Sequence, residues 1–396
     1  MERKRVRLTV IGVGNRARKY LHESTVNPSG SAVTCLVEPD PVRLASAQNE
    51  YGVPAGSCYS NADDFFAAGR DDVDAVMICS PDLDHYDQCM KAIEAGYDIL
   101  LEKPVGITPE ECRSISDAAT RKGVKVQVCY VLRFHPLYRK VREIISSGAL
   151  GKVISIDYTN FVGLDRALHT YVRGLWSRRE TCHSVILAKC CHDLDFIFWA
   201  TGSHAKKVSS TSSRLWFREE NAPEGSAARC CDCPLDATCA YSAPDMYLRR
   251  GVWISNFPVR DGETLKEALE REMREGPYGR CVFRCDNDVE DNGSLLMQME
   301  DGSKATLSID LFTRRDGRRA TFQMSGGEIE LEFDRLKAYS FDGKFKLEMD
   351  CNGLISQPYH GGLDLELFRN FLAACRGEEP LEAPVQECIE SHLVCF

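Results

Sequence analysis

The sequence lacks two features that would direct it to a membrane or to nucleic acid. No hydrophobic run among its 396 residues approaches the roughly 20 residues of a membrane-spanning helix. Basic residues are not in excess, since 49 lysines and arginines face 59 aspartates and glutamates, a formal net charge of −10. This balance offers no attraction for nucleic acid or an anionic membrane surface. We therefore expect a soluble protein that binds neither.

The apolar core of a secretion signal is also missing. Residues 1–5 (MERKR) lead directly into a predicted strand. Cysteine, by contrast, is abundant, with 19 residues. Most cysteines stand singly in apolar runs, as Cys35, Cys79 and Cys129 do, where the thiol behaves as a small buried hydrophobe. We expect a reduced, cytoplasmic protein.

Four cysteines lie close together in a segment with little periodicity, residues 221–246. Cys230, Cys231, Cys233 and Cys239 could ligate a structural zinc ion. Their spacing, Cys-Cys-x-Cys-x5-Cys, is not the paired C-x2-C pattern, and adjacent thiolates fit one tetrahedral ion poorly. A thiol cluster that pins a loop, with or without a disulfide, is the other interpretation. We predict no metal.

The N-terminal segment carries a nucleotide-binding pattern. A β-branched strand at residues 5–11 runs into residues 12–17 (GVGNRA), a G-x-G-x-x-A turn that opens a helix. Gly12 allows the tight turn, Gly14 lets a pyrophosphate approach the backbone, and Ala17 lets helix and strand pack closely. The helix N-terminus faces the phosphates. The pattern predicts a dinucleotide-binding domain.

An acidic residue ends the second predicted strand. Glu38 lies 24 residues after Gly14, close to the spacing of the acid that binds the adenosine ribose hydroxyls. A carboxylate there would repel a 2′-phosphate, which favours NAD over NADP. Arg43 lies near enough to make this preference moderate.

Alternation of strands and helices predicts the architecture. Apolar strands separated by helices up to residue 130 indicate a doubly wound parallel sheet, an α/β fold of the Rossmann type. After residue 130 strands dominate, and the Gly326-Gly327 pair between two of them signals a hairpin. We predict an NAD-binding domain at residues 1–130. Residues 131–396 are predicted to form an α+β domain with a large, mostly antiparallel sheet and a Cys-rich insert near 221–246.

Two charged residues follow the fourth long strand of the first domain. Glu102 and Lys103 come at the carboxyl end of a buried run, where open α/β sheets bind their ligands. Partial desolvation lowers the pKa of a lysine towards neutrality and suits it to proton transfer. The plainer interpretation is a strand exit whose charges face water.

A histidine marks the second half of the chain. His192 lies near the start of a predicted amphipathic helix, in which Phe196, Ile197 and Trp199 follow at helical spacing. An imidazole accepts or donates a proton near neutrality. The alternative is a helix-capping or core histidine, and the presence of Lys103 favours the site role.

These motifs together resemble the Gfo/Idh/MocA oxidoreductases. The resemblance rests on the Gly-rich turn, residues 79–81 (CSP) with His85, residues 102–104 (EKP) and residues 133–136 (RFHP). It implies that Lys103 contacts the nicotinamide ribose and the substrate, and that His192 hydrogen-bonds a substrate hydroxyl. It also implies a second-domain sheet whose exposed face pairs subunits, hence a homo-oligomer, a dimer or a tetramer.

One position departs from the family pattern. Many members have an aspartate four residues before the histidine, where this chain has Ala188. Either the neighbouring Lys189 supplies the second polar group, or Lys103 and His192 work with a different partner. The expected catalytic residues are Lys103, His192 and Lys189. The expected cofactor-binding residues are Gly12, Gly14, Asn15, Arg16, Ala17, Glu38, Arg43, Ser80, Pro81, His85, Glu102 and Lys103.

Three further residues are candidates for binding substrate. Arg173 and Trp176 suit polyol recognition through forked hydrogen bonds and an apolar ring face, although an exposed basic loop with an anchoring Trp explains them equally well. His360, in a His-Gly-Gly-x-Asp stretch that the family often has, can touch substrate. Capping of the next helix by the Gly-Gly turn and Asp364 is the simpler account.

The leading hypothesis is an NAD-dependent oxidoreductase that acts on a hydroxyl of a small carbohydrate, a sugar, polyol or glycoside. One alternative uses the same residues for hydrolysis of a glycoside through transient oxidation and elimination, as some members of the family do. The other is a cofactor-binding protein without turnover, which the intact Lys103 and His192 disfavour.

Overall fold

The first sheet of the protein is entirely parallel. The computed structural model describes the whole chain except residues 1–3, 255–256, 258, 261, 352 and 355–357. The six strands lie in the order β3-β2-β1-β4-β5-β6, which confirms the doubly wound α/β prediction. Their bounds are β1 Val6–Ile11, β2 Ser31–Val37, β3 Cys58–Tyr59, β4 Ala75–Ile78, β5 Asp98–Leu101 and β6 Val126–Val128.

The helices of this domain begin at residues that the sequence marks as caps. Asp40, Asn61 and Thr108 each accept a hydrogen bond from a backbone amide in the first turn, so they satisfy donors that have no partner within the helix. Left-handed glycines end three of the helices, α2, α4 and α5. The bounds are α1 Asn15–Val26, α2 Pro41–Tyr51, α3 Ala62–Ala67, α4 His85–Ala95 and α5 Pro109–Lys122.

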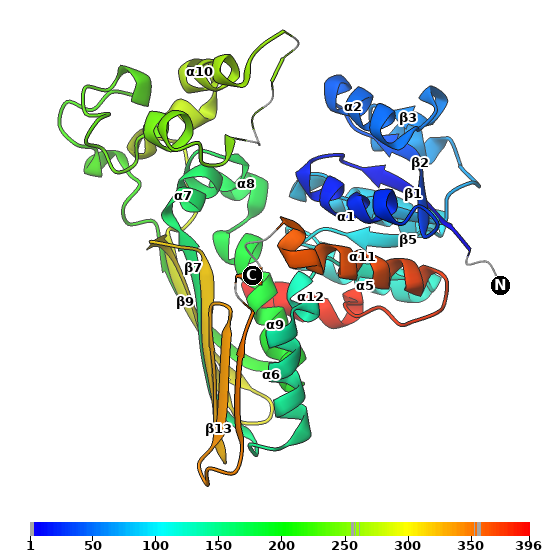
Figure 1. Cartoon of the computed structure of the whole chain (residues 1–396), viewed down its shortest axis with the longest axis vertical. Coiled ribbons are helices and arrows are strands. Elements are labelled where there is room, and N and C mark those ends of the chain that lie inside the picture. The colour runs from blue at the N-terminus through cyan, green and yellow to red at the C-terminus, as the bar shows by residue number, and fades with distance from the viewer. Residues whose placement is uncertain (1–3, 255–256, 258, 261, 352, 355–357) are drawn as a thin grey trace.

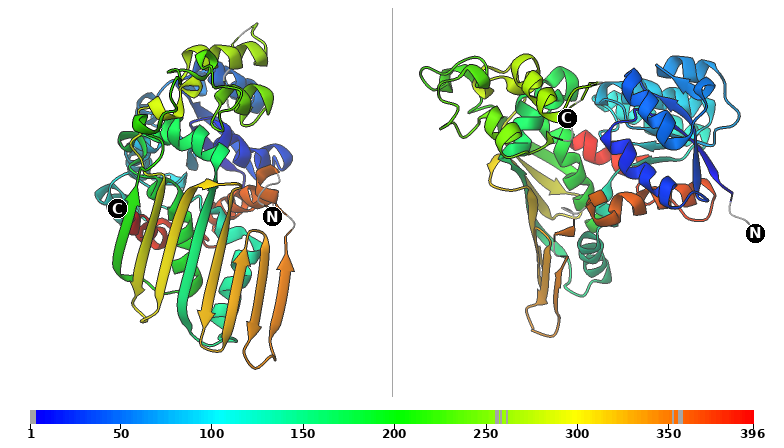
Figure 2. Two further views of the ribbon diagram at one scale, coloured as in Figure 1. Left: turned by 90° about the vertical axis from the view of Figure 1, so that its left-hand side faces the viewer. Right: turned by 45° about the horizontal axis from the view of Figure 1, so that its top comes forward.

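The second sheet is larger and mostly antiparallel, as predicted. Its order is β14-β13-β12-β11-β7-β10-β9-β8, and only β7 and β10 pair in parallel. The strands are β7 Val153–Gly163, β8 Ala205–Ser213, β9 Asn292–Met299, β10 Lys304–Thr313, β11 Gly317–Met324, β12 Gly327–Glu332, β13 Arg335–Ser340 and β14 Lys346–Asp350. Figure 2 shows this sheet face on, with no described helix over the outer face.

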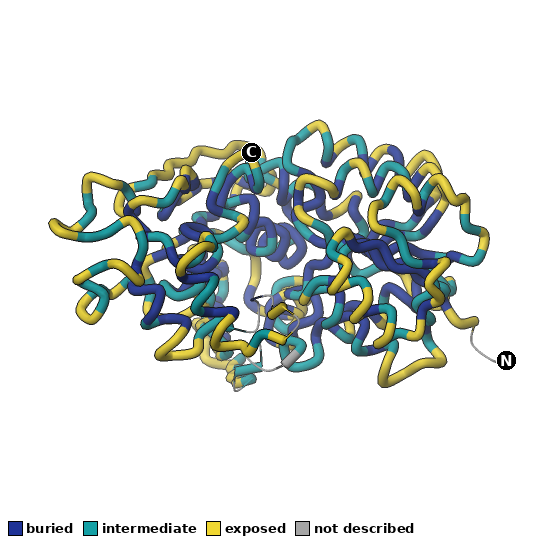
Figure 3. The backbone as a smooth tube through the Cα atoms, turned by 90° about the horizontal axis from the view of Figure 1, so that it is seen from above, coloured by how far each residue is buried: buried dark blue, intermediate teal, exposed yellow. Residues whose placement is uncertain are grey.

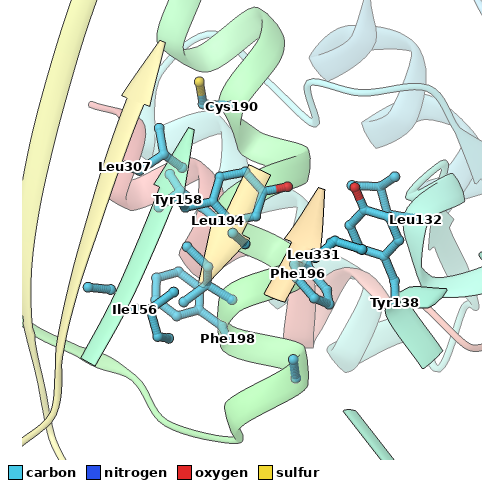
Figure 4. Packing of buried hydrophobic residues seen from close by; sticks show 14 of the residues in the cluster. Leu132, Tyr138, Ile156, Tyr158, Cys190, Leu194, Phe196, Phe198, Leu307 and Leu331 are labelled. Atoms are coloured by element: carbon cyan, nitrogen blue, oxygen red, sulfur yellow. The ribbon is translucent and has the colours of Figure 1, made fainter. Parts of the chain in front are cut away.

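Two helices cover the inner face of the sheet. They are α6 Pro136–Ser147 and α9 Cys191–Thr201, which pack against each other. In the core between helices and sheet, Phe196 of α9 meets Tyr138 of α6 edge to face, with ring centroids 4.6 Å apart. Ile156 and Tyr158 of β7 complete this layer (Figure 4). The helix that carries His192 is thereby fixed against the sheet.

The end of the chain returns to the first domain. α11 Leu363–Cys375 packs on α1, and α12 Val385–Cys395 packs on α5 (Figure 1). The amide of Val128 in β6 donates to the carbonyl of Ala383, 2.9 Å away. Buried side chains of both helices therefore complete the cores on the two faces of the parallel sheet. The tube in Figure 3 shows buried backbone running through both domains.

An insert with little regular structure separates β8 from β9. Residues 214–291 contain α10 Leu265–Glu275, opened by a Thr264–Glu267 capping box, and otherwise short turns. The insert packs beside the short helices α7 Leu164–Ala167 and α8 Arg179–Cys182 that follow β7. Within the described part of the chain, no helix is both long and apolar enough to cross a bilayer.

Candidate active site

The Gly-rich turn between β1 and α1 is shaped to receive a dinucleotide. Gly12 has φ +82°, and a Cβ there would lie 2.7 Å from the carbonyl oxygen of Cys79, so only glycine fits. A Cβ at Gly14 would meet no heavy atom within 4 Å, which leaves open space over the turn at the N-terminus of α1. Ala17 is fully buried against the strand. These residues fit a pyrophosphate.

Glu38 lies beside this turn as predicted. Its carboxylate accepts from the amide of Val13 at 3.0 Å and from Nη2 of Arg43 at 2.6 Å. The hydrogen bond to Glu38 raises the pKa of Arg43, although burial opposes the shift. The carboxylate is therefore fixed at the end of β2, next to Arg43, which the sequence predicted to lie near it.

Glu102 does not face water. It is 7% exposed, and its Oε1 accepts from Nε of Arg16 at 2.9 Å and from the hydroxyl of Tyr20 at 2.7 Å. Burial opposes ionisation, but Arg16 and Lys103 outweigh it and hold the pKa of Glu102 below its usual value. The interpretation of a solvated strand exit is wrong for Glu102, which ties the exit of β5 to helix α1.

Lys103 points across to the second domain. Its Nζ donates to the backbone carbonyl of Ala188 at 2.8 Å. Ala188 is the position where many family members have an aspartate, so here a main-chain oxygen meets the ammonium group. The partly buried Lys103 keeps further donors for another ligand.

His192 lies at the start of α9 and close to Lys103. Its Nδ1 is buried and has no hydrogen-bond partner among the residues that the structure describes, and its ring meets Tyr130 with centroids 5.2 Å apart. Burial, followed by the charges of Lys103, Arg318 and Lys189, moves the pKa of His192 well below its usual value. The imidazole is therefore neutral at pH 7 and has an unused polar atom, which the capping and core interpretations do not explain.

Lys189 is the third member of this group. It belongs to the π-helical turn Ile186–Cys190 that runs into α9, three residues before His192. Burial, and then the positive charges of Arg166 and Arg318, lower the pKa of Lys189 to about 7. An amine with this pKa is neutral in about half of the molecules at pH 7. It can accept a proton there.

Two buried carboxylates fix the helix that carries His192, and sequence reasoning missed both roles. Asp193 is fully buried and accepts from the hydroxyl of Tyr158 at 2.9 Å, and it also pairs with Arg318. Asp195 forms a two-pronged ion pair with Arg133, at 2.9 and 2.7 Å. Their signal in the sequence was two acids inside an otherwise apolar helix.

Trp176 bridges the two domains. Its Nε1 donates to Oδ2 of Asp82, 2.9 Å away, in the turn after β4. Asp82 is 6% exposed, and burial raises its pKa although His85 and Lys103 oppose the shift. The structure thus brings Trp176 to the Rossmann edge where Lys103 lies.

His85 holds two loops of the first domain together. Its Nδ1 lies 2.6 Å from the carbonyl oxygen of Pro104, and its Nε2 lies 3.1 Å from that of Ser80. The ring is buried, while Ser80 is partly buried and Pro81 is exposed at the carboxyl end of β4. This geometry makes His85 a positioning residue for the loops after β4 and β5.

Two predicted substrate residues lie elsewhere or have other partners. Arg173 is 1% exposed and points into the insert, where it donates to the carbonyls of Arg280 and Tyr241. The alternative interpretation, an exposed basic loop, is therefore wrong for Arg173. Nδ1 of His360 lies 2.9 Å from Oδ2 of Asp364.

The Asp364 carboxylate has a different role from the capping we expected. Gly362 is the N-cap of α11 and makes no side-chain cap, so the capping interpretation of Asp364 is wrong. Asp364 is fully buried and pairs with Arg16 at 3.1 Å. Burial opposes its ionisation, yet His360 and Arg16 lower its pKa to about 2. Arg16 is thereby engaged with the carboxylates of Glu102 and Asp364.

Comparisons with known proteins agree with this geometry. Residues 6–130 match the family model of the Gfo/Idh/MocA oxidoreductases, described as an oxidoreductase family with an NAD-binding Rossmann fold. The YteT protein of Bacillus subtilis is 24% identical over 75% of this chain and 69% of its own length. An inositol 2-dehydrogenase of Corynebacterium glutamicum is 28% identical over 52% of this chain and 57% of its own length.

Likeness in structure extends further than likeness in sequence. A levoglucosan dehydrogenase solved with NADH and levoglucosan superimposes with a TM-score of 0.72 at 15% identity, covering 99% of this chain and 95% of that one. At that identity the superposition shows a shared fold. With the inositol dehydrogenase relative and the Gly-rich turn, the family match identifies residues 6–130 as an NAD-binding Rossmann domain of the Gfo/Idh/MocA oxidoreductase type.

Proposed function

We propose that the protein is an NAD-dependent dehydrogenase that oxidises a hydroxyl of a sugar, polyol or glycoside. The observation that carries the proposal is the hydrogen bond from Nζ of Lys103, at the carboxyl end of β5, to the carbonyl of Ala188, next to the helix start of His192. Burial, followed by charges that include those of Lys103 and Lys189, lowers the pKa of His192. Two of the proteins compared above, an inositol dehydrogenase and a levoglucosan dehydrogenase, act on substrates of this class according to their names.

Each of the three side chains has a different role at the substrate hydroxyl. Bound NAD⁺ supplies the acceptor for the hydride that leaves carbon. Lys103 donates a hydrogen bond to the hydroxyl oxygen and stabilises the negative charge that develops on it. His192, neutral, orients the same hydroxyl. Lys189 accepts the proton, because its pKa of about 7 matches the task at neutral pH.

Residues of the first domain would bind the cofactor. The turn at Gly12 and Gly14 would hold the pyrophosphate, and Glu38 the adenosine ribose hydroxyls. The buried carboxylate of Glu38 would repel a 2′-phosphate, so we propose that NAD is preferred to NADP.

The proposal extends to the oligomeric state and to the compartment of the enzyme. The open outer face of the eight-stranded sheet would pair with a second copy, giving a dimer or tetramer. Every described cysteine is a free thiol, which supports a reducing compartment, the cytoplasm. The glycosidase alternative finds no support, since no relative named above is a glycoside hydrolase.

A substrate screen with a lysine variant tests the proposal. The purified protein is incubated with NAD⁺ and a panel of inositols, sugars and glycosides, and NADH is followed by absorbance. We expect NADH to accumulate with at least one polyol or sugar. Lys103→Ala should lower kcat/KM by roughly 100-fold or more, because one oxyanion donor contributes about this much.

The matched control is Lys122→Ala, which removes an exposed lysine of α5 that pairs with Glu94. It should leave turnover unchanged. Full turnover by Lys103→Ala, with folding verified by circular dichroism, would exclude the assignment of Lys103. Aglycone release without NADH would instead restore the glycosidase.

A further inference from the structure

The insert contains a small apolar cavity surrounded by thiols. Cys230, Cys233, Cys239 and Cys281 all line this space of about 20 Å³. Three of the four belong to the cysteine-rich segment, and Cys281 comes from a segment beyond α10. Burial raises the pKa of the Cys239 thiol, and the other three thiols lie near enough to add to the shift.

The backbone brings the four cysteines together from separate turns. Cys230 and Cys233 flank one 3-10 turn, in which the amide of Cys233 donates to the carbonyl of Cys230 at 3.2 Å. Residues 230 and 233 are therefore a C-x2-C pair, which the intervening Cys231 obscures in the sequence. An isolated bridge between Arg229 and Arg280 then places Cys281 beside the turn, with its amide donating to the carbonyl of Ala228 at 2.9 Å.

A buried cation beside the thiols has no anionic partner among the described residues. Arg173 is 1% exposed and contacts carbonyl oxygens and the sulfur of Cys230, 3.7 Å from Nη2, while Nη1 has no hydrogen-bond partner. Burying a charge without an opposite charge nearby is destabilising. A group with net negative charge at the cysteines would compensate this guanidinium.

The small core of the insert also favours stabilisation by a crosslink. Its core is small, and between β8 and β9 the described residues form one helix of more than two turns, α10. Segments with so little buried surface are commonly stabilised by a metal or by disulfides. All four cysteines are free thiols here.

We propose that Cys230, Cys233, Cys239 and Cys281 bind one Zn²⁺ ion as a closed, tetrahedral structural site. Binding displaces four thiol protons and leaves a site with a net charge of −2 beside Arg173. No electron is transferred. Among the described residues no side chains already surround a metal position, so the ligand shell closes as the ion binds.

The sequence cluster thus contributes three ligands rather than four. Cys231 is exposed and its sulfur lies 3.6 Å from the carbonyl of Met273, away from the cavity. It provides a matched control next to two ligands.

Metal analysis of the full-length protein tests the site. Protein purified without chelators or metal-affinity resin is measured by inductively coupled plasma mass spectrometry, and we expect one zinc per chain. Cys233→Ser and Cys281→Ser should reduce zinc to background, whereas Cys231→Ser should retain it. A wild-type protein without zinc, or a Cys231→Ser variant that loses zinc as Cys281→Ser does, would refute the site. Iron with a visible absorption band would show a cluster of another kind and refute zinc.

A second measurement covers the case in which the serine variants do not fold. Zinc in the wild-type protein is exchanged for Co²⁺, and the absorption spectrum is recorded. Thiolate charge-transfer bands together with the visible bands of tetrahedral Co²⁺ are expected. A spectrum of octahedral Co²⁺ would show that no tetrathiolate site exists.

Discussion

The amine of Lys189 shows how one residue can replace an absent carboxylate. Where Ala188 removes the side chain expected before His192, the next residue supplies an amine whose pKa burial and nearby arginines lower to about 7. In the function proposed above, this neutral amine is the base, and it adds no negative charge beside Lys103. The chemistry therefore depends on pH near neutrality.

Replacing Lys189 tests this base. In the wild type, kcat/KM for oxidation should rise as pH passes through about 7, since only the neutral amine accepts a proton. Lys189→Met should lower kcat/KM roughly 100-fold and abolish this inflection. The pH profile from 5.5 to 9 provides the measurement. Lys152→Met, at an exposed lysine before β7, serves as control, and an inflection that persists in Lys189→Met would assign it to another group.

Replacing Glu38 tests the cofactor preference. Glu38→Gln keeps the size of the side chain but removes the charge that, in the function proposed above, opposes a 2′-phosphate and binds the ribose hydroxyls. We expect NAD to bind more weakly by a factor of about 10, because a hydrogen bond to a charged group contributes roughly 1.5 kcal/mol. NADP should bind more tightly, since Arg43 then loses the stronger of its two carboxylate partners and keeps only Asp40 at 3.4 Å. Calorimetric titration with both nucleotides measures the change, and an unaltered NAD affinity would contradict the role of Glu38.

Side chains with a fixed spacing to a motif were predictable, and those that depend on distant partners were not. Gly12, Gly14 and Glu38 belong to one local pattern. The acceptor of Lys103 is a backbone carbonyl, which leaves no trace in the sequence. Arg173 was misplaced because a guanidinium is usually exposed, and its burial depends on carbonyl groups about 70 and 110 residues away, at 241 and 280.

At the scale of elements, α9 is fixed by charges inside an apolar core. Asp195 and Arg133 are each 2% exposed and join α9 to the exit of the parallel sheet. Arg133 also donates to the carbonyl of Glu382 at 2.7 Å, just before α12. One guanidinium therefore connects three elements, and it fixes the helix start where His192 lies.

Breaking this pair should be costly. Asp195→Ala removes the buried partner of Arg133, leaves it only the exposed Glu387 at 3.3 Å, and should lower the free energy of unfolding by about 3 kcal/mol. The double variant Arg133→Met/Asp195→Leu should recover part of the loss, since no charge remains to be compensated. Urea denaturation of the single and double variants gives both values. Equal stability of Asp195→Ala and the wild type would show that the pair contributes nothing.

The sequence predicted most elements of the first domain because caps and periodicity are local. Asn61 and Thr108, residue types that favour the start of a helix, cap α3 and α5. Four strands escaped prediction: β3 has only two residues, β8 (AKKVSSTSS) has no apolar alternation, and β13 and β14 form a short hairpin at one edge of the sheet. Strand identity there depends on neighbours in the sheet.

At the scale of the whole molecule, two polar contacts join the domains close to the candidate site. Trp176 reaches from the second domain to Asp82 of the first, close to Lys103, which itself donates across the junction to Ala188. These contacts fix the distance between the nucleotide turn and α9. Their loss should loosen the junction without unfolding either domain.

Replacing the tryptophan tests this link. Trp176→Phe keeps the aromatic ring but removes the donor to Asp82, and we expect KM for the substrate to rise about 10-fold with a smaller change in kcat. Hydrogen exchange should increase in the turn after β4. Trp216→Phe removes an indole donor within the insert, which bonds the hydroxyl of Tyr241, and should leave KM unchanged. An unchanged KM in Trp176→Phe would exclude the bridge from substrate binding.

The return of the last helices to the parallel sheet has a consequence for synthesis on the ribosome. Phe368 and Phe371 of α11 and Val385 of α12 belong to the cores on the faces of the first sheet. The nascent first 130 residues emerge long before these side chains exist. Apolar side chains on the faces of this sheet therefore remain partly exposed, and accessible to chaperones, until the final helix has been translated.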